Sequence, residues 1–437
     1  MFFTRRFYVV IAAIAVVLAS GVLFPPLFVV GQCLLVVLAV CVALEALVLY
    51  ALADVSAERS CAERFSLGDD NEVSITVSNP SALTLRLSLV DELPQQLQWR
   101  DFSLQVRLPA GVSRRVSYRV RPYTRGEYSF GHVLVFASSV VRLVERRLRR
   151  GSPIVVKVYP SFLMLRQYEL MAATDNLSEI GIKKVRHVGN NTEFEQIRDY
   201  VKGDDYRTIN WKASARRSHL MVNVYEDERA QQVFSVIDKG RLMQQSFQGM
   251  TFLDYAINAA LVLSYVVINK QDKAGIITFA EKMGAFVPAG RSAMQMKHIL
   301  ECLYAEQTTF GESDYSILPP GVNRVVGRRS FMVLYTNFTD FGSLERQLPY
   351  LRLVNQRHRL LVVFFEDVEM ADYISTPSHG VEEYYQHVIG EKLTYERRLM
   401  VSTLKQNGIH CLLVKPQSLT VDVINKYIEM KARHLLS

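Results

Sequence analysis

Two apolar runs at the start of the chain constrain its fold more than any other feature. The first covers residues 7–24 without a charge, which is about the length that crosses a bilayer as a helix. Pro25-Pro26 then stops that helix. A second apolar run follows at once, over residues 27–53, and Glu45 is its one charged residue. This pair predicts two transmembrane helices within residues 1–54 rather than a cleaved signal peptide.

Basic residues flank this predicted hairpin on both sides. Arg5 and Arg6 precede the first run, and Arg59 and Arg64 follow the second. Because cytoplasmic flanks are rich in Lys and Arg, we expect a multi-pass protein of the inner (cytoplasmic) membrane, anchored through residues 7–53. Both termini and the soluble domains are then expected in the cytoplasm. Glu45 is placed to snorkel to the surface, pair with a partner helix, or act within the membrane.

Short alternating strands dominate residues 55–160. The segment NEVSITVSN places Val73, Ile75 and Val77 on one face, and the next segment, SALTLRLSLVDELP, continues the alternation. Gly, Asn-Pro and Pro-Ala-Gly turns separate these runs. Strands at such spacing predict an antiparallel, immunoglobulin-like β-sandwich. Its basic run VRLVERRLRR, residues 141–150, has two interpretations: a solvated strand end or short helix, or a site for lipid headgroups.

The hydrophobic period changes in the last part of the chain. From residue 233 to 437, continuous apolar strands such as VFSVID and HRLLVVFFED alternate with amphipathic helical stretches. Strand-helix alternation of this kind predicts an α/β, doubly wound, mostly parallel sheet with any ligand site at the carboxyl ends of the strands. Residues 161–232 then form a linking region between the two soluble domains.

Composition and motifs exclude several classes of function. The net charge is +8, from 51 basic and 43 acidic residues, but the basic residues are not gathered in one arm, so no nucleic-acid partner is expected. The five cysteines include no CxxC pair, which argues against a zinc site or a disulfide framework. Phosphate-binding loops, GxSxG and HExxH are absent. We expect no cofactor.

A dense charged segment in the linking region carries a family resemblance. RDYVKGDDYRTINWKASAR resembles the signature of the bacterial family called "domain of unknown function 58", and the layout of the chain is similar too. The positions that match the signature are Glu193, Phe194, Arg198, Tyr200, Gly203, Asp204, Arg207, Ile209, Trp211, Ala215 and Arg216. The resemblance implies a C-terminal domain similar to von Willebrand factor A, and a partnership with MoxR-type AAA+ ATPases in protein assembly or maturation.

The implied von Willebrand A domain would lack its usual metal site. Such domains hold Mg²⁺ with a D-x-S-x-S loop, and here Asp238 is followed by Gly240 and Leu242 in place of the two hydroxyls. Asn337 stands where a later carboxylate is expected. The candidate ligands that remain are a threonine, Thr308 or Thr309, and Asp340 as a substitute carboxylate. Lys239 and Arg241 place positive charge beside the loop, which argues against a bound cation. We therefore expect no bound metal.

The signature itself allows three interpretations. The alternation in TINWK predicts a strand with Ile209 and Trp211 on one face. An Asp-Arg-rich turn beside a tryptophan suits a structural clasp with cation-π support, or a surface for a partner. Catalysis by Asp204 and Asp205 needs burial and raised pKa values. The sequence thus predicts a non-enzymatic, membrane-anchored scaffold or adaptor for proteins. The alternative is a hydrolase or nuclease using Asp204, Asp205 and Arg207.

Overall fold

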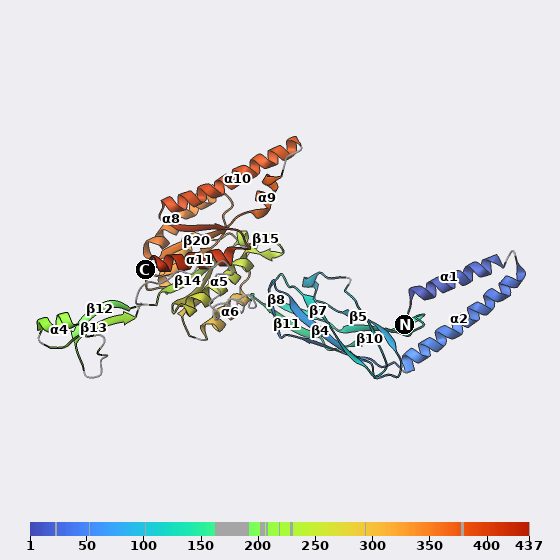
Figure 1. Cartoon of the computed structure of the whole chain (residues 1–437). Coiled ribbons are helices and arrows are strands. Elements are labelled where there is room, and N and C mark those ends of the chain that lie inside the picture. Colours follow the sequence, from blue (N-terminus) through green and yellow to red (C-terminus); the bar gives the residue numbers. More distant parts are fainter. Residues whose placement is uncertain are drawn as a thin grey trace. The chain divides into compact units, whose positions relative to one another are not determined.

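Two separate units make up the chain, Met1–Ser161 and Phe162–Ser437, and each is described by itself (Figure 1). The computed structural model describes residues 1–21, 24–51, 53–100, 102–161, 192–201, 206, 209–217, 219–227, 230–292, 294–376 and 380–436.

An apolar helical pair begins the first unit. Helix α1 spans Arg5–Ser20 and helix α2 spans Pro25–Ala51, so the first helix ends earlier than the apolar run predicted. The helices approach closely because Gly31 has no side chain: a Cβ there would lie 2.6 Å from the side chain of Leu18. Helix α2 has a mean hydropathy of 2.9 with 11 % of its apolar window buried, which makes it long and apolar enough to cross a membrane.

Antiparallel sheets form the rest of the first unit. Their orders are β1-β10-β9-β5-β6, β2-β4-β7 and β3-β11-β8, and within the last sheet β3 and β11 run parallel. The predicted alternation is present, since Val73, Ile75 and Val77 of β4 are all buried. The strands are β1 (Phe2–Phe3), β2 (Ser56–Cys61), β3 (Arg64–Ser66), β4 (Asn71–Ser78), β5 (Leu85–Asp91), β6 (Leu104–Leu108), β7 (Ser113–Val120), β8 (Gly126–Phe130), β9 (Val133–Ser138), β10 (Val144–Arg150) and β11 (Ile154–Tyr159).

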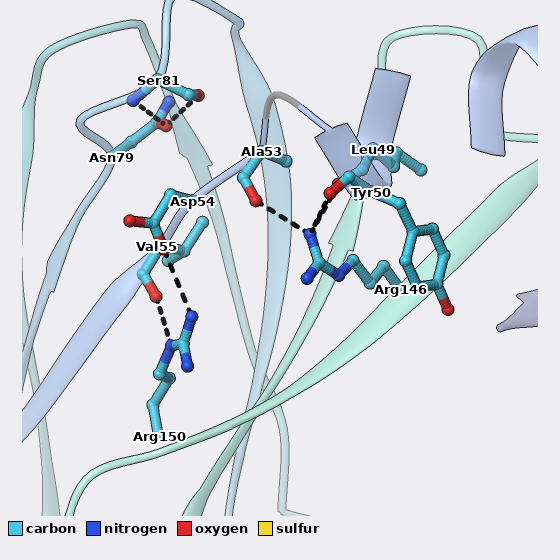
Figure 2. Close-up of polar contacts among 9 residues, drawn as sticks. All are labelled: Leu49, Tyr50, Ala53, Asp54, Val55, Asn79, Ser81, Arg146 and Arg150. Carbon is cyan, nitrogen blue, oxygen red and sulfur yellow. Dashed lines mark hydrogen bonds and ion pairs between the residues drawn. The ribbon is translucent and has the colours of Figure 1, made fainter. Parts of the chain in front are cut away.

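Hydrogen bonds from strand β10 hold the end of α2 against the sheets. The guanidinium of Arg146 donates to the carbonyl oxygens of Leu49 (2.8 Å), Tyr50 (3.3 Å) and Ala53 (3.0 Å), as Figure 2 shows. These carbonyls have no partner within the helix, and a cation there also opposes the negative end of the helix dipole. Arg150 continues the contact with the carbonyl of Val55 at 2.7 Å. Part of the basic run is therefore an internal helix cap.

The interior of the first unit also holds an ion pair that corrects one sequence interpretation. The sequence predicts Arg59 as a basic flank of the hairpin, but its side chain is buried in the sandwich. Its Nε donates to the carboxylate of Asp91 at 2.9 Å, and its guanidinium lies over the ring of Phe130. Alternation explains the difference, because Arg59 falls on an inward position of β2, opposite Ile75.

A six-stranded sheet organises the second unit. Its order is β18-β17-β14-β19-β20-β21, and all neighbours are parallel except β18, which is an antiparallel edge. The strands are β14 (Gln232–Asp238), β17 (Lys273–Phe279), β18 (Met283–Gly290), β19 (Phe331–Tyr335), β20 (Arg359–Phe365) and β21 (His410–Val414), with a small ribbon of β15 (Ser246–Phe247) and β16 (Met250–Thr251).

Helices cover both faces of this sheet, as a doubly wound fold requires. One core cluster joins the sheet to α5, α6 and α11, and a second joins the opposite face to α7, α8 and α10. Helix α5 is also apolar enough to cross a membrane, but 72 % of its window is buried here as a core helix. The helices are α5 (Phe252–Asn269), α6 (Gln295–Ala305), α7 (Leu318–Val325), α8 (Phe341–Arg357), α9 (Val368–Ser375), α10 (Val381–Gln406) and α11 (Leu419–Ala432).

Candidate functional site at the carboxyl edge of the parallel sheet

Four neighbouring strands end at one edge of the six-stranded sheet. Strand β14 ends at Asp238, β19 at Tyr335, β20 at Phe365 and β21 at Val414. In doubly wound sheets, the loops that follow the carboxyl ends of the strands form the binding crevice. The sequence predicts that any ligand site lies here, and Asp238, Asn337 and Arg397 line cavities at this edge.

Asp238 lies at the centre of the edge and is 2 % exposed. Its Oδ1 accepts hydrogen bonds from the amide of Gly240 at 2.8 Å and from the hydroxyl of Ser313. Its Oδ2 accepts from the hydroxyls of Thr336 at 2.7 Å and Tyr315 at 3.2 Å. Burial raises the pKa of this carboxyl group, and the four hydrogen bonds oppose that shift. Both carboxylate oxygens are therefore engaged by donors of the protein itself.

Gly240 makes room for one of these donors. A Cβ at this position would lie 2.1 Å from the Ser313 hydroxyl oxygen. Gly240 stands where a metal-binding von Willebrand A loop would have a hydroxyl. The hydroxyl is supplied instead by Ser313, which lies on the loop after α6. Only the folded structure brings this loop to the end of β14, so the local motif alone did not reveal it.

The charged neighbours of the loop are also paired. Lys239 Nζ lies 2.7 Å from Glu306, and Arg241 lies 2.8 Å from Glu312. Their positive charge is therefore compensated, which weakens the argument that they repel a cation. Thr309 donates its amide to the carbonyl of Lys239 at 2.8 Å.

Asp340, the substitute ligand considered from the sequence, caps a helix. Its Oδ1 accepts from the amide of Ser343 at 2.7 Å in the first turn of α8. Within the part of the chain that the structure describes, no cluster of three or more His, Cys, Asp or Glu side chains is arranged to hold a metal ion.

Arg397 of α10 ties the ends of two strands together. Its guanidinium donates to the carbonyl of Phe365 at 2.6 Å and to the side-chain oxygen of Asn337 at 3.3 Å. Asn337 in turn donates to Gln245 at 3.3 Å. Burial lowers the pKa of Arg397, while the nearby Asp367 and Glu366 oppose the shift. Asn337, which stands where a metal-binding domain would have a carboxylate, thus links Arg397 to Gln245 in a hydrogen-bond network.

Two adjacent cavities open at this edge. The larger, of about 260 Å³, lies on the Arg397 side, and the smaller, of about 70 Å³, lies on the Asp238 side. They share one wall, made of Leu242, Asn337, Phe338 and Thr339. The larger cavity is also lined by side chains of both charges, including Glu366, Asp367, Glu396, Arg397 and Arg398. The lining is thus partly apolar and carries side chains of both charges.

The family-signature segment forms a hairpin of its own. Strand β12 (Thr192–Asp199) pairs with β13 (Met221–Asp227), and helix α4 (Trp211–Arg217) lies between them in sequence. Asn210 holds the helix to the hairpin: its Oδ1 accepts from the amide of Ala213 at 3.0 Å and its Nδ2 donates to Asn223 at 2.8 Å. Neither Asn210 nor Asn223 was singled out from the sequence.

The strand predicted for TINWK is wrong at the tryptophan. Trp211 begins helix α4 and is 70 % exposed, whereas Ile209 bridges Val222 of β13. Asn210 is a strong helix cap, so it ends the extended segment and starts the helix. Among the described residues, Trp211 has no cation-π contact of the kind that the clasp interpretation expected.

The other signature positions are only partly described. Arg198 and Arg216 are exposed, and Tyr200 is half-buried. Glu193 and Phe194 lie on β12, but their side chains are outside the described part of the structure. Gly203, Asp204, Asp205 and Arg207 lie outside the described residues altogether. The clasp and catalytic interpretations of this segment therefore stay predictions.

Comparison with known proteins supports the family resemblance. The family described as "Protein of unknown function DUF58" matches residues 196–395, which include most of the signature hairpin, though not Glu193 and Phe194, and most of the α/β domain. This part of the chain is therefore similar to the DUF58 family. The chain is 25 % identical over 264 residues to the uncharacterized protein YeaD of Bacillus subtilis. This alignment covers 59 % of the chain and 64 % of YeaD.

A second DUF58-type relative covers a shorter segment. The chain is 25 % identical over 190 residues to the uncharacterized protein Rv1480 of Mycobacterium tuberculosis, covering 42 % of this chain and 59 % of that protein. The aligned segments thus span less than two thirds of both relatives.

Solved structures resemble about a quarter of the chain. The CARDB domain of a Pyrococcus furiosus protein is similar at 13 % identity, covering 25 % of this chain and 90 % of that domain, with a TM-score of 0.20. The native alpha-2-macroglobulin of Escherichia coli is similar at 17 % identity, covering 25 % of this chain and 17 % of that chain, with a TM-score of 0.22.

Proposed function

We propose that this protein is a membrane-anchored scaffold that presents a metal-free, von Willebrand A-like domain to protein partners. The observation that carries the proposal is the hydrogen bonding of Asp238. Four donors of the protein engage the one carboxylate that a metal at this edge would need, and a larger cavity opens beside it. The domain then binds partners through side chains rather than through a bridging cation.

The sheet order supports the von Willebrand A assignment. In such domains an acidic loop follows the first strand of a doubly wound sheet, and here Asp238 ends β14, the first strand of the sheet in sequence. The single antiparallel strand, β18, lies at one edge.

Membrane anchoring rests on the N-terminal hairpin. Helix α2 is strongly apolar along its length and mostly exposed, as a helix surrounded by lipid would be. With Arg5 and Arg6 before α1, the proposed orientation places both termini and both soluble domains in the cytoplasm. A reporter that is active only in the periplasm, fused after Ser437, should stay silent. A strong periplasmic signal would reverse the orientation.

The proposed partner surface combines the 260 Å³ cavity with the free half of α10. Helix α10 contributes Leu393, Thr394 and Arg397 to the cavity wall, and its earlier turns expose apolar side chains. These exposed residues are Val381, Tyr384, Tyr385, Val388, Ile389 and Tyr395. Aromatic side chains next to a cavity are typical anchors in protein interfaces. The family resemblance suggests that a MoxR-type AAA+ ATPase is the partner.

Site-specific crosslinking tests this function. A photo-crosslinking amino acid is placed at Tyr385 or Leu393 in the full chain in cells, with Tyr123 of the first unit as an exposed aromatic control. We expect both α10 positions, and not the control, to capture a MoxR-type ATPase that mass spectrometry identifies. If neither α10 position captures a protein that the control fails to capture, this surface is not the partner site.

A further inference from the structure

A short loop of the first unit is held between the two apolar helices. Residues 139–143 connect β9 to β10, and the carboxylate of Glu45 in α2 accepts from the amides of Arg142 (3.1 Å), Leu143 (2.9 Å) and Val144 (3.2 Å). On the other side, the amide of Thr4 donates to the carbonyl of Leu143 at 3.1 Å, one residue before α1 begins. The loop therefore lies where the chain enters the hairpin and leaves it.

The tip of this loop is apolar and exposed. Val140 is 61 % exposed and Val141 is 58 % exposed, whereas Leu143 is buried. Glu45 lies six residues before the end of α2 at Ala51, a rise of about 9 Å along the helix axis. A loop bonded to Glu45 therefore sits deeper along the hairpin than the end of α2. At that depth a membrane boundary would cover the two valines.

An arginine-lined hollow of about 520 Å³ lies beside the loop. It opens on the outer face of the five-stranded sheet, and Arg86, Arg107 and Arg142 are its basic residues. Glu145 is the one acidic residue among the described side chains that line it. In the sheet register, Arg86 of β5 lies directly opposite Arg107 of β6. Like charges at directly opposed positions destabilise an antiparallel pair unless an anion offsets them.

The positive charge of the hollow exceeds its negative charge, since three arginines face one carboxylate, that of Glu145. No ion pair joins Arg86, Arg107 or Arg142 to a carboxylate within the described part of the chain. The pKa of Arg86 is lowered, first by the charge of Arg142 and then by burial, by Arg107 and by Arg6. A bound anion would relieve this repulsion. Planar guanidinium groups form paired hydrogen bonds with phosphate oxygens, which makes a phosphate ester the anion that fits best.

We propose that this arginine hollow binds the phosphate headgroup of an anionic lipid, while Val140 and Val141 insert among the acyl chains. The proposal rests on the membrane anchoring proposed above. A lipid is favoured over a soluble phosphate because Arg142 of the hollow lies in the same loop as the exposed Val140 and Val141, and its amide is bonded to Glu45 of α2. Anionic lipids also give the cytoplasmic leaflet its negative surface potential. The loop would thereby fix the first unit against the membrane surface.

The main test measures the melting temperature of the full chain in lipid nanodiscs. The discs contain phosphatidylcholine, with or without phosphatidylglycerol, and the test variant is Arg86→Gln with Arg142→Gln. The control is Arg114→Gln with Arg115→Gln, which removes the same charge from exposed positions on β7. We expect phosphatidylglycerol to raise the melting temperature of the wild type and the control by several degrees, and to leave the test variant unchanged. An equal rise in all three proteins would overturn the site.

A second arm separates a lipid from a soluble phosphate. Millimolar glycerol phosphate is added to the chain in phosphatidylcholine discs, where we expect no stabilisation. A rise as large as that given by phosphatidylglycerol, absent from the Arg86→Gln, Arg142→Gln variant, would replace the lipid assignment with a soluble phosphate ester.

A third arm measures insertion of the loop. Val141→Trp is compared with Val112→Trp, which lies on an exposed turn between β6 and β7. Lipids brominated on the acyl chains should quench the added fluorescence of the first variant and not of the second; equal quenching would contradict insertion. Flotation with phosphatidylcholine vesicles checks the anchoring separately. A chain that floats with neutral vesicles but shows no quenching fails only this proposal, and a chain that does not float fails the anchoring.

Discussion

Two buried acidic residues, one in each unit, illustrate how the donors around a carboxylate decide its role. Glu45 in α2 and Asp238 at the end of β14 are both buried, and neither carboxylate has an ion pair with a described cationic side chain. Glu45 accepts mainly from backbone amides of a distant loop. Asp238 accepts mainly from side-chain hydroxyls of its own domain. The first contact joins a helix to a sheet, and the second ties the end of β14 to the loops around it.

The two sites differ in whether the groups that donate to the carboxylate can also accept a hydrogen bond. A backbone amide is always a donor, so an acceptor must face it. A hydroxyl group rotates and accepts as readily as it donates. Replacing each carboxylate by its amide, as in Glu45→Gln and Asp238→Asn, should therefore destabilise the two sites to different extents. The NH₂ group of the new side chain can donate to a hydroxyl but not to a backbone amide.

The largest effect should follow Glu45→Gln. Each side-chain oxygen of Glu45 faces at least one backbone amide, so either orientation of the glutamine sets its NH₂ against an N–H that cannot accept. Leaving such groups unsatisfied should cost roughly 2–4 kcal/mol. Thermal melting of the full chain in detergent measures this loss. Glu58→Gln, at an exposed position of β2, serves as the control. Equal melting temperatures for the two variants would show that Glu45 does not stabilise the contact between α2 and the sheet.

A buried histidine with no polar partner extends the comparison. His358, between α8 and β20, is fully buried, and neither ring nitrogen has a hydrogen-bond partner among the described residues. Burial lowers its pKa from 6.5 to about 4, and the charges of Arg357 and Arg329 add to the shift. The unfolded chain therefore binds a proton first as the pH falls. The contribution of neutral His358 to the free energy of unfolding is fully present above pH 6.5, and it is lost as the pH falls from 6.5 to 4.

This loss should amount to about 2 kcal/mol at pH 5, and His358→Leu should abolish it. The measurement is the melting temperature between pH 8 and pH 5. His298→Leu, at an exposed position of α6, is the matched control and should keep the wild-type pH dependence. A wild-type slope in the His358→Leu variant would show that another group titrates in this range.

The smallest structural effect should follow Asp238→Asn. The amide oxygen can keep the bonds from Gly240 and Ser313, while the NH₂ donates to the hydroxyls of Thr336 or Tyr315, which rotate to accept. We expect a change of less than about 1 kcal/mol, measured by melting beside the Glu45→Gln variant. A loss as large as that of Glu45→Gln would mean that the hydroxyls at this site are fixed as donors, and the comparison would fail.

Periodicity predicted the larger elements of the fold. The alternation of Val73, Ile75 and Val77 gave strand β4, and the continuous apolar run VFSVID gave the buried strand β14. The change of period also located the α/β part of the chain. These predictions succeed because apolar spacing records which side of each element is buried.

Long-range polar contacts were not predictable in the same way. Glu45 bonds to a loop 97–99 residues away, and Ser313 reaches Asp238 across 75 residues. Neither contact leaves a local pattern. The alternation in TINWK predicts a strand at Trp211, whereas Asn210 caps helix α4 there, and such capping residues can be read from sequence. The candidate site was thus located by topology at the strand ends, while its hydroxyl donors appeared only in the structure.

Melting in the presence of divalent cations tests the central claim of a metal-free binding domain most directly. A ligand that binds only the folded state must raise its stability, so the full chain in detergent is melted with and without millimolar Mg²⁺ or Mn²⁺. Because the carboxylate of Asp238 is already engaged by four donors of the protein, we predict no change in melting temperature. A clear rise with either cation that Asp238→Ala abolishes would contradict the account and make the carboxyl edge a metal-dependent site.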